Sequence, residues 1–235
     1  MKVKQIIALV IVVALLMTGS VLVTMAYLTD TQTVTNTFTI GNVKIVLNEA
    51  WVNAKGEALN EAGEVVQDIA EAKRVTENGY QLMPGRIYTK DPTVKVMAGS
   101  EQSYIRMIVT ITEYAELCAA YGKEVGALAL TDLILNGAEG LGAGWEFATQ
   151  NGGEFEYRFN TVADENTEIP ALFTQIQLSG DVSTSALEKL DGMKIEVVAH
   201  AIQAEGLANA VAAWDAFDQT INPTTVVSET PVGGQ

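Results

Sequence analysis

A chain of 235 residues is long enough for one large domain, or for one domain with tails. Its 14 basic and 29 acidic side chains give a formal net charge of −15, which disfavours nucleic acid and anionic lipid as partners. The single cysteine, Cys118, excludes an internal disulfide framework. In an exported protein, this cysteine usage points to a bacterial surface rather than to a eukaryotic secretory pathway.

Residues 1–26 have the order of a secretory signal peptide. Two lysines precede an unbroken apolar run over residues 6–17, and the small residues Thr24 and Ala26 stand at −3 and −1 before Tyr27. We therefore expect cleavage between Ala26 and Tyr27. The alternative is an uncleaved membrane anchor, because the apolar stretch nearly reaches the roughly 20 residues that a span needs.

The next segment, residues 27–38, is rich in threonine, lacks proline and is prone to form a strand. After cleavage it is a free N-terminus whose only charged side chain is Asp30. It can pair with its own sheet or add to the sheet of a neighbouring subunit, and the residues alone leave both open. In the second case, alternate side chains fill pockets and fix the register. The candidate assembly-strand residues are Tyr27, Leu28, Thr33, Val34 and Phe38.

Beyond this segment, short strand signals alternate with turns. The clearest strand covers residues 104–112, where Ile105, Met107, Val109 and Ile111 share one face. Further strands are predicted over residues 37–47 (with a bulge or turn at 41–42), 93–97, 145–148, 154–160, 172–178 and 193–203. The pattern predicts an all-β, jelly-roll-like antiparallel β-sandwich over residues 39–221, with a flexible tail at 222–235.

Short helices are predicted at the periphery of this sandwich. Residues 113–121 have helical periodicity with Cys118 on the apolar stripe, so this cysteine is interpreted as a buried hydrophobe rather than a reactive thiol. Residues 207–217 predict a closing helix with one apolar face formed by Leu207, Val211, Trp214 and Phe217. Residues 48–82 are interpreted as a surface excursion with one short helix near 68–74.

The chain offers little that is typical of catalysis. His200 is the only histidine and lies on the mixed face of a strand, which favours a solvated or rim position over metal ligation. The sequence has neither a GxSxG elbow nor a P-loop, and the glycines of residues 137–144 lack a following amphipathic helix. Oxygen ligands in the loop 164–168 suit Ca²⁺, but without EF-hand spacing a solvated loop is preferred. We therefore predict no enzymatic activity, no catalytic residue, no cofactor and no metal.

Three stretches of the chain resemble a known family. The junction AYLTDTQTVTNTFTIGNV at residues 26–43 resembles the AYFTD-type junction of exported proteins processed by a SipW-type signal peptidase. Residues 82–111 and 194–217 are similar to blocks of the TasA/CalY (camelysin) family. The resemblance covers most of the chain except residues 48–80 and the tail.

The resemblance implies a jelly-roll protein secreted by a Gram-positive bacterium to the extracellular matrix or cell surface, where it forms biofilm fibres. It implies self-association, with the mature N-terminal segment inserted as a strand into the next subunit and other matrix proteins as further partners. Camelysin itself implies the alternative of a cell-surface metalloprotease, although the sequence has no HExxH. A second alternative, if residues 1–26 stay attached, is a monomeric membrane-anchored surface adhesin.

Overall fold

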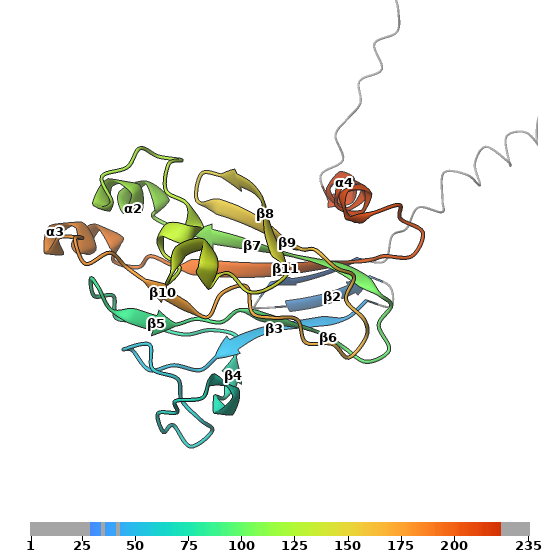
Figure 1. Cartoon of the computed structure of the whole chain (residues 1–235), viewed down its shortest axis with the longest axis horizontal. Coiled ribbons are helices and arrows are strands. Elements are labelled where there is room, and N and C mark those ends of the chain that lie inside the picture. The colour runs from blue at the N-terminus through green and yellow to red at the C-terminus, as the bar shows by residue number, and fades with distance from the viewer. Residues whose placement is uncertain (1–28, 34–35, 41–42, 222–235) are drawn as a thin grey trace, which may run out of the picture.

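A computed structural model describes residues 29–33, 36–40 and 43–221 (Figure 1). Residues 1–26, for which the sequence predicts a signal peptide, lie outside the described residues, as do Tyr27, Leu28, Val34 and residues 222–235. Most of the described chain forms antiparallel strands, with a few short helices, so the predicted β-rich class is confirmed.

The larger sheet has six strands in the order β2-β1-β11-β7-β9-β8, and every neighbouring pair is antiparallel. The N-terminal hairpin of the described chain therefore forms one end of this sheet, and β8 forms the other. The strands are β1 (Thr29–Thr33), β2 (Asn36–Ile40), β7 (Ser103–Ile111), β8 (Trp145–Asn151), β9 (Glu154–Phe159) and β11 (Ile195–Gln203).

A second layer faces the six-stranded sheet in Figure 1 and contains two smaller sheets. One has the order β4-β3-β6, and the other pairs β10 with β5. The strands of this layer are β3 (Ile45–Ala50), β4 (Arg74–Val75), β5 (Ile87–Thr89), β6 (Thr93–Val96) and β10 (Gln175–Gln177). The strand predicted over residues 37–47 is therefore two strands, β2 and β3, and they belong to different sheets.

The main hydrophobic core lies between the layers and follows from the alternation of side chains along each strand. The face predicted for residues 104–112 is confirmed, since its four apolar side chains are at most 3% exposed. Alternate residues of β11 and of the facing strands complete this core: Ile45, Leu47, Val94, Val96, Val197, Ala199 and Ala201.

Helices cover the ends and one outer face. The α-helices are α2 (Tyr114–Ala120), α3 (Thr184–Leu187) and α4 (Ala210–Ile221), and the 3-10 helices are η1 (Ile69–Glu71), η2 (Leu130–Asp132), η3 (Gly137–Gly140) and η4 (Glu188–Leu190). The predicted burial of Cys118 on α2 is confirmed. Among the described residues, none of these helices combines the length and apolar character needed to cross a membrane.

The apolar face predicted for the closing helix is partly wrong. Val211 is 60% exposed, whereas Ala213, Trp214 and Phe217 of α4 are buried. Leu207 precedes the helix and packs against the same cluster. The buried stripe therefore follows a spacing of three and four residues, which is the spacing that keeps side chains on one side of an α-helix.

Candidate functional site

The N-terminal hairpin of β1 and β2 closes one edge of the six-stranded sheet. β1 runs antiparallel to β11 in a register that pairs Thr29 with Ile202 and Thr33 with Val198. Its other side pairs with β2, where Thr31 is opposite Phe38. The structure therefore places both described candidates of the assembly strand, Thr33 and Phe38, in the hairpin of their own chain, and the domain boundary predicted after residue 38 falls inside β2.

β11 is the strand that receives this hairpin. It is nine residues long, and its other edge is fully paired with β7. Ala199 and Ala201 on its inner face are completely buried in the main core, so the strand is held independently of the hairpin. Removal of β1 would therefore leave an ordered edge with unpaired backbone groups over five positions, which is a template for strand addition.

The outer face of β11 and β7 is covered by α4 through a buried arginine. The Arg106 side chain is 3% exposed and lies over the rings of Trp214 and Phe217, at 4.6 and 4.8 Å from the ring centroids. Its guanidinium donates two hydrogen bonds to the Asp218 carboxylate, at 2.6 and 3.2 Å, and one at 3.0 Å to His200 Nδ1. Arg106 thereby joins both strands to the helix.

His200 is not at a solvated rim, as the sequence indicated, but is buried under α4. Its ring stacks on Phe217 with the centroids 4.8 Å apart. Burial, reinforced by the charge of Arg106, lowers the pKa of His200 to about 4, and Asp218 only partly opposes this. The histidine is therefore neutral at pH 7 and serves as a hydrogen-bond acceptor for Arg106.

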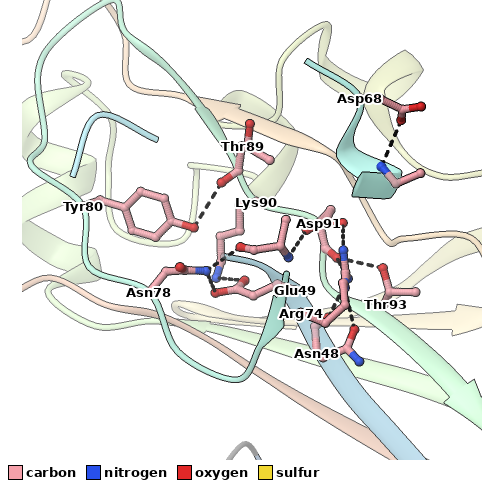
Figure 2. Close-up of polar contacts among 12 residues, drawn as sticks. Asn48, Glu49, Asp68, Arg74, Asn78, Tyr80, Thr89, Lys90, Asp91 and Thr93 are labelled. Atoms are coloured by element: carbon pink, nitrogen blue, oxygen red, sulfur yellow. Dashed lines mark hydrogen bonds and ion pairs between the residues drawn. The ribbon is translucent and has the colours of Figure 1, made fainter. Parts of the chain in front are cut away.

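A second polar cluster lies within the smaller layer, around Glu49 at the end of β3 (Figure 2). Glu49 Oε2 accepts a hydrogen bond from Lys90 Nζ at 2.7 Å, and Glu49 Oε1 accepts one from Asn78 Nδ2 at 2.9 Å. The Lys90 and Glu49 side chains are only 7% and 10% exposed. One carboxylate therefore holds an ammonium group and a primary amide in a largely dehydrated place.

Asp91 forms an ion pair with Arg74 beside this group. Its second oxygen accepts a hydrogen bond from the Ala50 backbone N–H at 2.7 Å, and Arg74 also donates to Asn48 Oδ1 at 2.9 Å. Burial raises the pKa of Asp91, and burial together with the nearby carboxylates raises the pKa of Tyr80. Tyr80 therefore stays protonated and donates to the Thr89 carbonyl at 3.1 Å.

The remaining candidates from the sequence take part in hydrogen bonds or in close contacts between loops. Glu165 accepts a hydrogen bond from the Gly99 N–H and Asp164 accepts one from Gln102, and no group of three or more metal-ligand side chains exists within the described residues. A Cβ atom at Gly140 or Gly142 would lie 2.0 or 1.9 Å from a backbone oxygen, so these glycines permit close packing of loops.

Comparison of the chain with models of known protein families, with characterised proteins and with solved structures finds no match.

The sequence does not predict the cluster around Glu49, because the pattern over residues 48–82 favours a surface excursion. One signal was present: Glu49 continues the inward alternation of Ile45 and Leu47. A charged side chain on the buried face of a strand requires a buried partner. That partner, Lys90, is 41 residues away, and the sequence does not identify it.

Proposed function

We propose that this protein is a secreted structural subunit that assembles head-to-tail into extracellular biofilm matrix fibres by donating its N-terminal strand to a neighbour. The observation that carries the proposal is the pairing of β1 with β11. The hairpin closely follows the proposed cleavage site between Ala26 and Tyr27 and ends one sheet, and β11 is anchored without it. The β11 edge of one copy therefore suits the β1 strand of another.

Exchange between copies produces a polymer for a geometric reason. A strand donated from one end of a subunit to an edge elsewhere on the next is a heterologous contact, and such a contact propagates as a filament when its rotation does not close a ring. The same backbone hydrogen bonds form in both arrangements, so the difference in free energy between them is small.

The proposal includes a jelly-roll-like β-sandwich as its scaffold and export as its prerequisite. Cleavage between Ala26 and Tyr27 by a SipW-type peptidase frees the N-terminus, and the matrix or cell surface of a Gram-positive bacterium is the place of assembly. The likeness of residues 26–43, 82–111 and 194–217 to the TasA/CalY family supports this, and so does the acidic surface, which favours solubility before assembly.

Cysteine trapping tests whether the strand is exchanged. Directly opposed residues of an antiparallel pair have Cα atoms about 4.5–5.5 Å apart, which is within the reach of a disulfide. Mature chains carrying Thr33→Cys are mixed with chains carrying Val198→Cys, assembled and oxidised. We expect fibres by electron microscopy and a disulfide-linked dimer on a non-reducing gel, because Thr33 and Val198 are register partners.

The matched control replaces Asp30 instead of Thr33, since Asp30 pairs with Ala201 and lies three positions out of register. This control mixture should give fibres without the linked dimer. The proposal fails if the mature chain forms no fibres. A chain that carries both Thr33→Cys and Val198→Cys supplies the second test, and the proposal also fails if this chain forms fibres but closes its disulfide only within itself.

A further inference from the structure

The Glu49 cluster brings together an amine, a primary amide and a carboxylate. Their arrangement suits attack of the amine on the amide, with the carboxylate transferring protons. Figure 2 shows the side chains of Lys90 and Asn78 both directed at Glu49. The two nitrogens bind different oxygens of the same carboxylate, Lys90 at 2.7 Å and Asn78 at 2.9 Å. Lys90 directly follows β5, and Asn78 lies in the irregular segment after β4, so the cluster joins two separate segments of the chain.

The side chain of Lys90 lies in a largely dehydrated place. Its side chain is 7% exposed, Nζ lies 5.9 Å from the centroid of the Tyr80 ring, and Glu49 is 10% exposed. In a dehydrated place, an ion pair and the neutral pair formed by proton transfer approach each other in free energy, because burial penalises both charges. Transfer of one proton along the hydrogen bond makes Lys90 Nζ a nucleophile.

The amide of Asn78 is held as an electrophile. Its Oδ1 accepts a hydrogen bond from the Val52 backbone N–H at 2.9 Å, which stabilises negative charge on this oxygen in the manner of an oxyanion hole. Its Nδ2 donates to the Ala50 carbonyl at 2.8 Å as well as to Glu49. The nitrogen that would leave is thus already bound to the carboxylate that receives the proton of the amine.

We propose that Lys90 and Asn78 become joined by an intramolecular isopeptide bond, with Glu49 as the proton carrier. Lys90 Nζ gives a proton to Glu49 Oε2 and attacks Asn78 Cγ, and the bond from Cγ to Nδ2 breaks. The two protons that Nζ loses are delivered through Glu49 to Nδ2, which leaves as an ammonium ion, and Glu49 returns to its carboxylate form. The products are one amide bond and one ammonium ion, so that atoms and charge balance without an oxidant or any other reactant.

The cross-link does not depend on fibre assembly, and it constrains one segment of the chain covalently. Residues 78–90 become a closed ring that fixes the irregular segment to the end of β5. A covalent ring reduces the conformational freedom of the unfolded chain, as a disulfide does. Unlike a disulfide, it resists reduction.

Mass spectrometry of the full-length chain tests the proposal. We expect the measured mass of the intact protein to be lower than the mass calculated from its sequence by the mass of one ammonia molecule. Trypsin should then yield a branched product in which residues 75–86, with Asn78, are bonded to residues 87–95, because Lys90 is no longer a cleavage site. In Glu49→Gln, which keeps a polar side chain but cannot carry the proton, we expect full mass and linear peptides.

Two further variants complete the experiment. Lys90→Arg should also keep full mass and should unfold at a lower temperature, whereas Lys123→Arg, which changes an exposed lysine paired with Asp132, should lose ammonia as the wild type does. Full mass and only linear peptides in the wild type overturn the proposal. So does a linear but lighter peptide 75–86 that persists in Lys90→Arg, because that product is a succinimide at Asn78-Gly79.

Discussion

Replacing Arg106 with methionine is expected to lower the free energy of unfolding by about 1.5–3 kcal/mol, the range for the loss of a hydrogen bond to a charged group, because its main counter-charge, Asp218, is 50% exposed. Methionine preserves much of the apolar stem but leaves His200 Nδ1 without its donor. It also removes the positive charge that pairs with Asp218 and Glu156, at 2.6 and 3.5 Å, and the stacking of the guanidinium on Trp214. Denaturant unfolding followed by circular dichroism measures the change.

Arg158→Met is the matched control for this measurement. Arg158 lies opposite Arg106 in the sheet and binds Glu156 at 2.6 Å, but its side chain is 29% exposed. An ion pair that water reaches contributes about 0–1 kcal/mol, so the control should unfold almost as the wild type does. Similar losses in the two variants would show that Arg106 is not the link between α4 and the sheet.

The inner half of the sheet could be predicted because its signal is local. In residues 104–112, apolar side chains alternate strictly, and a strand presents alternate residues to opposite faces, so the buried face can be predicted from the sequence. The same holds for β11. Cys118 on α2 was placed correctly for the equivalent reason, since helical spacing within one turn decides which residues share a stripe.

The polar half of the same strands could not be predicted, because a local pattern does not show what covers a face. His200 alternates with core residues, a pattern that predicts a solvated or rim position, and Arg106 lies opposite it on the same face of the neighbouring strand. Both are buried because α4, which begins more than 100 residues after Arg106, packs over them. Val211 was misplaced for a related reason: the stripe chosen from the sequence omitted Ala213, a small residue that lets the helix approach the sheet closely.

The pairing of Lys90 with Glu49 illustrates a second limit. Glu49 continues the inward alternation of β3, but Lys90 taken alone has the pattern of an ordinary surface charge. Only the meeting of β3 with the end of β5 places them together. Buried ionic clusters depend on such long-range encounters, so they are the features that sequence periodicity predicts least well.

Acidification is expected to destabilise the protein through His200. Its pKa is about 4 in the folded protein, against 6.5 for an ordinary histidine. Between these two values the unfolded chain binds the proton and the folded chain does not, so stability falls as the pH is lowered from 6.5 towards 4. The shift corresponds to a loss of about 3 kcal/mol once the pH is below 4.

The direction of this effect follows from the groups around the ring. Arg106 of β7 faces Nδ1 and repels an imidazolium, Phe217 of α4 stacks on the ring and excludes water, and Asp218 supplies only a partial counter-charge because it already binds Arg106. Once His200 is protonated, its Nδ1 can no longer accept the hydrogen bond from Arg106. Protonation therefore opposes the docking of α4 rather than strengthening it.

Comparison with His200→Gln isolates this histidine from the other acidic groups. Glutamine can still accept from Arg106 but does not titrate, and the contribution of Asp91, whose raised pKa acts in the opposite direction, is common to both proteins. The unfolding free energies of the wild type and of His200→Gln, measured from pH 7 to pH 4, should converge or cross. Only the wild type loses the stability that the neutral His200 contributes at higher pH. Two parallel curves over this range would mean that His200 is protonated in the folded protein as readily as in the unfolded chain.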